Sequence, residues 1–258
     1  MKTQKNLFET IISLENIELA HKLASKGKQH YREVKWVNAN KEVAFRWIHN
    51  LLKHKRFVTS PYKVEVAFKG GKERTIHKLP YFPDRIVQHA LVHVCKDVWI
   101  KSMIRDTFQS IPGRGTLDCF KRVSRFIENN QPKYAMKMDI NKFYQSVSSQ
   151  YIMDNNVLRL GDKDANWLLS KILLSLPNLP LGNHTSQYAG NLLLSPIDWY
   201  IKQDLKVKGY FRYCDDLVFF SDSKQELKAV YKLVRNKLSE LNLKVKPCEI
   251  YNMEEGSC

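Results

Sequence analysis

The sequence predicts an α+β fold, in which long helices and short β-hairpins follow one another without a regular alternation of strand and helix. Alternating apolar residues predict a strand over 134–140 and hairpins over 64–79 and 210–220. Gly70-Gly71 marks the turn of the first hairpin, and Cys214-Asp215-Asp216 forms the tip of the second. Apolar residues at helical spacing predict helices over residues 6–26, 41–53, 84–100, 117–127, 164–176, 186–205 and 224–241.

The composition is that of a soluble globular protein rather than of a membrane or secreted one. Of the 258 residues, 43% are hydrophobic and 26% are charged, which is ordinary for a chain that buries a large core. No run of eighteen apolar residues occurs, so a membrane span is excluded, and the amino terminus lacks a signal-peptide core. The five cysteines are scattered without Cys-x-x-Cys pairing, which favours neither a zinc site nor disulfides. We therefore expect a cytoplasmic protein.

The positive charge is concentrated in one part of the chain. The net charge is +16. Residues 1–150 hold 28 Lys and Arg against 13 Asp and Glu, whereas residues 151–258 hold 14 against 13. A generally basic protein would spread its charge more evenly, so the asymmetry favours a surface that binds a polyanion such as nucleic acid.

Adjacent acids at Asp215 and Asp216 stand between apolar arms, with Phe211 and Tyr213 before them and residues 217–220 after them. Two adjacent acidic residues commonly lie in a solvent-exposed turn. At the tip of a buried hairpin, however, they repel each other and lose solvation, and a divalent cation with oxygen ligands removes that cost.

Asp139 is the candidate for a third acid, because it ends the apolar strand that begins at Tyr134. It could instead cap a helix, since an aromatic pair follows it. If the two strands lie side by side, Asp139 stands beside the Asp215-Asp216 tip. Three carboxylates there would suit two magnesium ions about 3.5–4 Å apart, an arrangement used for in-line phosphoryl transfer.

Taken together, the motifs resemble those of the reverse transcriptase family. They cover roughly residues 60 to 247 in the family's order, and the ordered set is far more specific than any one motif. The similar segments are Lys72–Ile76, Asp84–Ala90 and Gly113–Thr116 for the fingers, Asp139–Tyr144 for motif A, Leu179–Gln187 for motif B, Tyr213–Asp216 for motif C and Leu241–Pro247 for motif D.

This resemblance implies a right-hand polymerase fold with fingers and palm, in which a small antiparallel palm sheet is flanked by helices. Residues 1–132 would form an amino-terminal extension and the fingers, and residues 133–258 the palm, with some interleaving of the two. Relatives continue past motif D into a primer grip and a thumb. The chain ends at Cys258, soon after Pro247, so we expect the thumb to be absent and its clamp to come from a partner or from the template RNA.

The implied activity is RNA-directed DNA synthesis from an RNA template, a DNA or RNA primer and deoxynucleotides. Asp139, Asp215 and Asp216 would be the catalytic acids and the ligands of two Mg²⁺ ions, for which Mn²⁺ would substitute. The Ile140 carbonyl would contribute to one of these sites. Tyr144 would act as the steric gate, whose ring crowds a ribose 2′-hydroxyl.

Further residues are implied in nucleotide binding and, more weakly, in binding template and primer. Arg74 would grip the triphosphate through its guanidinium fork, and Gly182 would let the backbone approach the incoming base pair. For Lys72 and Arg85, an ion pair with the neighbouring Glu73 or Asp84 is an equal alternative. Leu181 and Gln187 are the other residues implied near the nucleotide, and Lys72, Arg85, Arg114 and Tyr213 those implied at template and primer.

Motif B favours one subfamily. Leu181 stands where group II intron and retron enzymes usually have Gln, and Ser186-Gln187 stands where they have Ser-Pro. That form is similar to the reverse transcriptases of diversity-generating retroelements, which misincorporate opposite template adenines and work with a small basic oligomeric accessory protein. Phage-defence and other bacterial reverse transcriptases are the alternatives within the family. A nucleic-acid-binding protein with a polymerase fold and no independent turnover is the alternative from another class.

Overall fold

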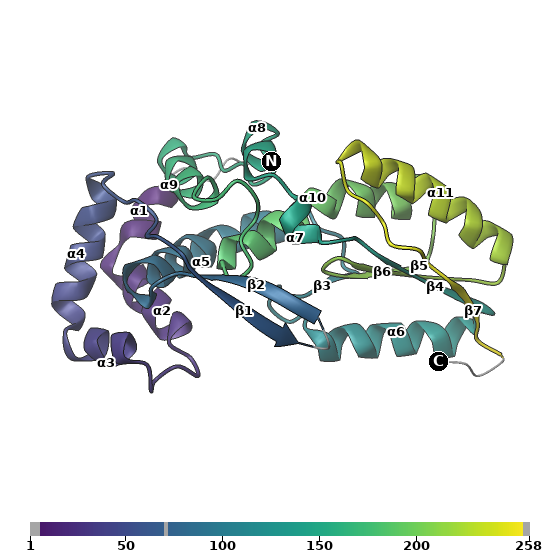
Figure 1. The fold of residues 1–258 in the computed structure, drawn as a ribbon, viewed down its shortest axis with the longest axis horizontal. Coiled ribbons are helices and arrows are strands. Elements are labelled where there is room, and N and C mark those ends of the chain that lie inside the picture. Colours follow the sequence, from purple (N-terminus) through teal and green to yellow (C-terminus); the bar gives the residue numbers. More distant parts are fainter. Residues whose placement is uncertain (1–5, 70–71, 255–258) are drawn as a thin grey trace. The chain divides into compact units, whose positions relative to one another are not determined.

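The computed structural model of the protein describes residues 6–69 and 72–254, which form two compact units (Figure 1). Unit 1 comprises residues 1–99 and 148–189, and unit 2 comprises residues 100–147 and 190–258. The chain thus passes between the units more than once. The predicted assignment of 1–132 to fingers and 133–258 to palm remains a prediction.

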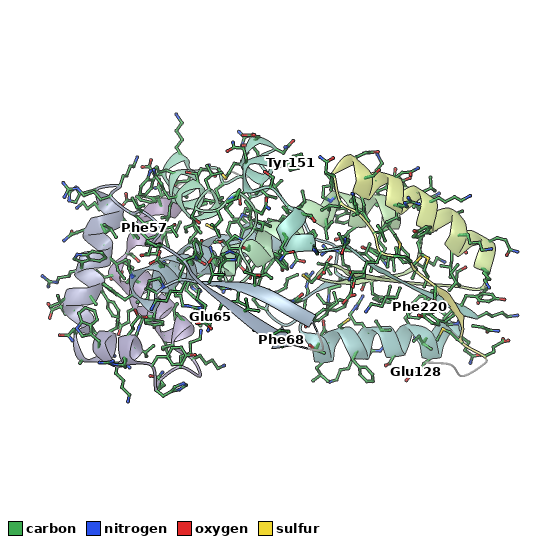
Figure 2. All side chains as sticks on the ribbon, in the orientation of Figure 1. Phe57, Glu65, Phe68, Glu128, Tyr151 and Phe220 are labelled. Carbon is green, nitrogen blue, oxygen red and sulfur yellow. The ribbon has the colours of Figure 1, made fainter. Side chains whose placement is uncertain are left out.

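Unit 1 is built from helices and one hairpin. Phe57, with only 1% of its surface exposed, is one of its buried side chains (Figure 2). Its elements are α1 (Leu7–Ile12), α2 (Leu14–Ala24), α3 (Arg32–Ala39), α4 (Lys41–Lys53), β1 (Lys63–Lys69), β2 (Lys72–Lys78), the irregular turn η1 (Tyr81–Arg85), α5 (Ile86–Ile100, all but its last residue), α8 (Ser149–Asp154), α9 (Lys163–Leu173) and the first part of α10 (His184–Trp199).

The single helix predicted over residues 6–26 is wrong, because Ser13 divides that segment into α1 and α2. Ser13 has extended backbone angles (φ −59°, ψ 145°), and its hydroxyl accepts a hydrogen bond from the Asn16 N–H at 3.2 Å. A serine in this position satisfies an otherwise free amide at the start of a helix. The apolar residues keep helical spacing on both sides of the break, so spacing alone did not reveal it.

The hairpin predicted over residues 64–79 is confirmed. β1 and β2 pair antiparallel in a continuous register, from Lys63 opposite Lys78 to Lys69 opposite Lys72. The predicted turn residues Gly70 and Gly71 lie outside the described residues. Glu65 and Phe68 lie on β1, where Phe68 is 79% exposed (Figure 2).

A five-stranded sheet in the order β3-β5-β6-β4-β7 forms the centre of unit 2. β5, β6, β4 and β7 pair antiparallel, and the edge strand β3 pairs parallel with β5. The predicted small antiparallel sheet is confirmed, and β3 is an additional strand at its edge. The elements of unit 2 are β3 (Thr107–Phe108), α6 (Thr116–Asn130), β4 (Tyr134–Asp139), α7 (Phe143–Ser146), the remainder of α10, η2 (Tyr200–Asp204), β5 (Gly209–Tyr213), β6 (Asp216–Ser221), α11 (Lys224–Glu240) and β7 (Ile250–Asn252).

Helices cover both faces of this sheet, with α6 on one side and α11 on the other (Figure 1). On the α6 side, Phe108, Phe211 and Phe220 form a buried cluster against which Phe126 of α6 packs. Gly209 makes this close packing possible: a Cβ there would lie 2.6 Å from the Phe220 carbonyl oxygen and 2.9 Å from the Phe126 ring. The predicted α+β class is confirmed.

No helix among the described residues has both the length and the apolar character needed to cross a membrane.

Replacing Gly209 by Ala should therefore destabilise unit 2. The added methyl group must displace the Phe126 ring or the β6 backbone, and overpacking of this kind costs about 1–3 kcal/mol of unfolding free energy. Urea denaturation measures the change. Gly115→Ala is the control for steric overlap, because a Cβ there meets nothing within 4 Å. Since Gly115 is the N-cap of α6, this variant should cost only the loss of about 0.5–1 kcal/mol expected of Ala at a cap. Equal stabilities for the two variants would contradict the packing described.

Candidate active site

The register of β4 and β6 brings the predicted acids together. Asp139, the last residue of β4, lies directly opposite Asp216, the first residue of β6. The turn before β6 consists of Cys214 and Asp215, and the Ile140 N–H donates a hydrogen bond to the Asp215 carbonyl at 3.3 Å. All three acids therefore stand at one end of the unit 2 sheet, as the side-by-side placement of the two strands predicted.

Asp215 is in the least favourable electrostatic position of the three. Desolvation raises the pKa of its carboxyl above the ordinary value, and the nearby charges of Asp216 and Asp139 raise it further. A hydrogen bond with the Cys214 side chain lowers the pKa but does not cancel these effects. Cys214 itself has a φ of 56°, in the left-handed region that non-glycine residues seldom adopt. The turn thus holds a carboxylate where its negative charge is costly.

Two lysines lie against the other two acids. Lys137 Nζ is 3.0 Å from Asp216 Oδ1, and Lys246 Nζ is 2.5 Å from Asp139 Oδ1. The side chains of both pairs are between 30% and 58% exposed, and ion pairs this exposed contribute only about 0.2–1 kcal/mol. The lysines therefore neutralise the acids without holding them strongly.

The carboxylates of Asp139, Asp215 and Asp216 are suitable ligands for a divalent cation, although they are not yet arranged around a common point as ligands would be. Among the described residues, no three His, Cys, Asp or Glu side chains are grouped as ready-made metal ligands. Asp139 Oδ1 is buried, and the Lys246 ammonium at 2.5 Å is its ionic partner. Three carboxylates at one end of the sheet, one of them desolvated, are a donor set suited to a hard cation.

Segment 244–246 borders this group of acids. The Lys246 N–H donates to the Asp139 carbonyl at 2.9 Å, and the Asn141 N–H donates to the Lys244 carbonyl at 2.7 Å. Val245 forms an isolated antiparallel bridge with Ile140. The segment similar to motif D therefore lies beside the segment similar to motif A, and this backbone pairing carries Lys246 to the acid that it faces.

Tyr144 lies next to the acid turn within the same unit. Its hydroxyl is 3.2 Å from Cys214 Sγ, and burial raises the pKa of the phenol well above its ordinary value, so the ring is neutral. Gly190 of α10 gives the neighbouring Phe143 room, because a Cβ there would lie 2.8 Å from the Phe143 ring. The Tyr144 hydroxyl thus lies against the acid turn, and the predicted role of Tyr144 as a steric gate remains a prediction.

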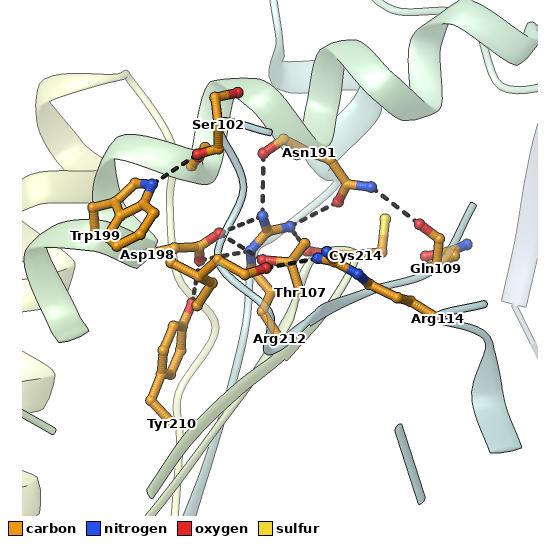
Figure 3. Close-up of polar contacts among 12 residues, drawn as sticks. Ser102, Thr107, Gln109, Arg114, Asn191, Asp198, Trp199, Tyr210, Arg212 and Cys214 are labelled. Carbon is orange, nitrogen blue, oxygen red and sulfur yellow. Dashed lines mark hydrogen bonds and ion pairs between the residues drawn. The ribbon is translucent and has the colours of Figure 1, made fainter. Parts of the chain in front are cut away.

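Behind the turn lies a buried ion pair that the sequence analysis missed (Figure 3). Arg212 of β5 and Asp198 of α10 are both 0% exposed in their side chains, and Arg212 Nη2 lies 2.6 Å from Asp198 Oδ2. Asp198 also accepts hydrogen bonds from the Tyr210 hydroxyl at 2.6 Å and from the Thr107 hydroxyl at 3.0 Å. Burial alone would lower the pKa of Arg212, but the Asp198 charge outweighs it and raises that pKa.

Arg212 also holds the backbone of the acid turn. Its Nη1 donates to the Cys214 carbonyl at 2.8 Å and to Asn191 Oδ1 at 2.9 Å, while Asn191 donates to the Gln109 carbonyl at 3.1 Å (Figure 3). The carbonyl held in this way belongs to the residue immediately before Asp215. A signal for this network was present in the sequence: Asp198 and Arg212 are single charges within otherwise apolar stretches of a helix and a strand.

Two weaker predictions, Arg114 and Tyr213, also fall in unit 2, where both are engaged in the fold. Arg114 Nη1 donates to the Ile104 carbonyl at 2.8 Å, and desolvation lowers the pKa of its guanidinium. The Tyr213 hydroxyl lies 3.0 Å from the Thr116 hydroxyl at the start of α6. Their predicted contacts with template and primer remain predictions.

The remaining predicted residues belong to unit 1. The Leu181 carbonyl accepts a hydrogen bond from the His77 N–H at 3.1 Å. Gly182 has a φ of 118°, and a Cβ on it would lie 2.6 Å from the His77 carbonyl oxygen, so the fold itself requires glycine here. Gln187 lies on α10 and is partly buried.

The basic fingers candidates are only partly described. Lys72 and Arg74 lie on β2, opposite Lys69 and Ala67 respectively, and their side chains are outside the described part of the chain. Arg85 forms no ion pair within the described residues, and Asp84, its proposed alternative partner, accepts instead from the Ser60 N–H at 3.0 Å.

Comparison with known families gives one extensive match. The family described as reverse transcriptase (RNA-dependent DNA polymerase) matches residues 66–252, a range that includes all three acids and the segment around Leu181. No curated protein matches the sequence.

Solved structures with a similar fold include telomerases. Apo telomerase from Candida tropicalis is 15% identical with a TM-score of 0.52, and the match covers 85% of this chain and 50% of that one. Telomerase from Candida albicans in complex with a TWJ fragment of telomeric RNA is 12% identical with a TM-score of 0.55, covering 82% and 47%. The chain thus spans about half the length of these structures, and at such identities the likeness concerns the fold alone.

The buried network generates a stability prediction. Asp198→Asn leaves the Arg212 charge unpaired in the core, and breaking a buried pair in this way should lower the unfolding free energy by about 3–5 kcal/mol. Arg212→Met combined with Asp198→Leu removes both charges and should cost less than Asp198→Asn alone. Urea denaturation of both variants tests this. A loss below about 1 kcal/mol for Asp198→Asn would contradict the network.

Proposed function

The chain belongs to the reverse transcriptase family, and from that premise we propose that it is an RNA-directed DNA polymerase, which copies an RNA template into DNA by nucleotidyl transfer. The observation that carries the proposal is the β4–β6 register, which places Asp139 opposite Asp216 and beside the Asp215 turn. The basic amino-terminal part of the chain supports a polyanionic template.

The three acids and the Ile140 carbonyl would hold two Mg²⁺ ions, with Mn²⁺ as a substitute. When bound, such ions activate a primer 3′-hydroxyl and neutralise charge on the triphosphate and on the departing pyrophosphate. The raised pKa of Asp215 supports this assignment, because the cost of its desolvated charge disappears when a cation binds.

Lys137 and Lys246 would be displaced when cations bind. Exposed ion pairs contribute only about 0.2–1 kcal/mol each, so a cation that several carboxylates bind together can replace them. The lysines therefore neutralise the acids in the absence of metal without preventing the cations from binding. Released from the acids, both ammonium groups stay near the site, where they favour binding of an anionic triphosphate.

Tyr144 would exclude the ribose 2′-hydroxyl and so favour deoxynucleotides. Its fixed, neutral ring beside the acid turn supports that role. Arg74 would bind the triphosphate, and Leu181, Gly182 and Gln187 would border the incoming base pair. Lys72, Arg85, Arg114 and Tyr213 are the weaker candidates for contact with template and primer.

We assign the enzyme to the diversity-generating retroelement type, on the form of residues 179–187. Leu181 is apolar where related enzymes carry an amide, so it offers the base pair no side-chain hydrogen bond. Weaker geometric selection there would permit errors at template adenines. A small basic oligomeric protein would be the accessory partner of such an enzyme.

A second function has support from the lysine pairing. If Lys137 and Lys246 kept their contacts with Asp216 and Asp139, no cation could bind two of the three acids. The chain would then bind nucleic acid through a polymerase fold without independent turnover. The two functions differ in one measurable respect, which is extension of a primer.

Primer extension on an RNA template with Mg²⁺ and the four deoxynucleotides should yield DNA. The Asp215→Ala/Asp216→Ala variant should lose at least about a thousandfold in rate, because metal stabilisation of the transition state amounts to several kcal/mol. Asp204→Ala, which removes an exposed acid elsewhere in unit 2, is the matched control and should retain activity. Tight template binding without extension by the intact chain would overturn the polymerase proposal in favour of the binding function.

Replacing Leu181 by Gln should restore hydrogen bonding at the base pair. Misincorporation opposite template adenines should then fall several-fold, as measured by sequencing the extension products. Leu174→Gln makes the same exchange at an exposed position of unit 1 and should leave the error spectrum unchanged. Identical error rates in the Leu181→Gln variant and the intact chain would count against the retroelement assignment.

A further inference from the structure

Unit 1 carries an exposed aromatic surface on α3 and α4, which we call the α3–α4 aromatic face. It consists of Trp36, Val43, Trp47 and Phe82. Trp36 and Trp47 are each 48% exposed, and Val43, one helical turn before Trp47, is 68% exposed. Soluble proteins rarely leave two tryptophans half exposed within one small area unless the surface binds something.

The rings of this face are held in place rather than hanging free. The Phe82 ring centroid lies 5.2 Å from that of Trp36 and 5.2 Å from that of Trp47, with interplanar angles of 64° and 41°. The residue before Phe82 is tied to α3, because the Tyr81 N–H donates to Glu33 Oε2 at 2.6 Å. The aromatic surface is therefore preorganised, which lowers the entropy lost when a ligand binds.

The two indoles also differ from those of Trp99 and Trp199. Trp99 donates its ring N–H to the Leu158 carbonyl, and Trp199 donates to the Ser102 carbonyl. Trp36 and Trp47 make ring contacts with Phe82, and neither indole N–H donates a hydrogen bond within the described residues. Each thus offers a ring surface and a donor to solvent.

The charge around the face is almost entirely positive. Residues 31–56 contain seven Lys and Arg against two Glu, with no Asp. Both glutamates are already engaged, Glu33 with the Tyr81 N–H and Glu42 with Arg46 at 2.8 Å. Arg32, which is exposed, precedes Trp36 by four residues and so lies on the same side of α3. Arg46 and Lys55 are paired with Glu42 and Asp164, and the other Lys and Arg leave this segment with a net positive charge.

From this combination we infer that the α3–α4 aromatic face binds single-stranded RNA, with bases stacked on Trp36 and Trp47 and phosphates near the surrounding Lys and Arg. Exposed aromatic rings beside basic side chains form such binding surfaces, and stacking does not depend on base identity. A protein partner is disfavoured, because the cores of protein interfaces are depleted of lysine, of which residues 31–56 hold four.

The face belongs to unit 1 and the acid turn to unit 2, and the inference does not depend on the proposed polymerase activity. Through this face, unit 1 itself would contact unpaired RNA, in addition to any contact that templated synthesis requires. A duplex has its bases stacked internally, so this face should distinguish single-stranded from double-stranded RNA.

Fluorescence anisotropy of a labelled twelve-nucleotide single-stranded RNA, in EDTA, measures this binding without divalent cations. Trp36→Ala/Trp47→Ala should weaken it about tenfold or more, since stacking contributes about 1–3 kcal/mol per base. Trp36→Phe/Trp47→Phe keeps the aromatic faces and should stay within about threefold of the intact chain. Leu117→Ala/Phe120→Ala, which removes an exposed apolar pair from α6, should have no effect.

The salt dependence provides a second readout. Removing the tryptophans should leave the slope of log affinity against log salt unchanged, whereas Arg32→Ala/Lys35→Ala should reduce it by about 1. Affinity for a duplex of the same length should be unchanged by the tryptophan substitutions. The inference is overturned if the folded Trp36→Ala/Trp47→Ala variant binds single-stranded RNA as the intact chain does, or loses duplex affinity equally. It is also overturned if that variant changes only its self-association in sedimentation.

Discussion

The buried contact between Arg212 and Asp198 is the constraint on which the acid turn depends. A charge pair taken completely out of water is tolerated only when nearly every polar atom finds a partner, and here Tyr210, Thr107 and Asn191 supply those partners. The same guanidinium holds the Cys214 carbonyl. The position of Asp215 is thus tied through Arg212 of β5 to α10, and through Asn191 of α10 to the loop that carries Gln109.

The charges behind the acid turn are buried and fully paired, whereas those in front of it are partly exposed and weakly paired. Behind it, Arg212 and Asp198 are fully buried and mutually satisfied, so this part of the site is rigid. In front of it, Asp139 and Asp216 face lysines that are partly in solvent, and Asp215 bears a charge that its surroundings disfavour. A site of this kind keeps its backbone fixed while its carboxylates can exchange one cationic partner for another. That combination suits metal ions that arrive with a substrate.

Much of this architecture was predictable from sequence, and what was not has identifiable causes. Alternating apolar residues and turn signals predicted β1, β2 and β4, and the acid at the end of a strand predicted where Asp139 would lie. The break at Ser13 escaped because apolar spacing continues across it. Asp198 and Arg212 escaped because their pairing joins a helix to a strand, a tertiary contact that no local pattern encodes. Lys246 reaches Asp139 through a bridge between distant segments, for the same reason.

Under the proposed function, Asp139 of β4, Asp216 of β6 and Asp215 of the turn form a cation site whose charges repel one another until a cation binds. Thermal unfolding of the intact chain and of Asp215→Asn, each in EDTA and in saturating Mn²⁺, tests it directly. The account predicts that Asp215→Asn has the higher Tm in EDTA, by about 2 °C, because it removes a desolvated charge, and that it gains less than the intact chain from Mn²⁺. A lower Tm in EDTA, together with an equal gain from Mn²⁺, would contradict it.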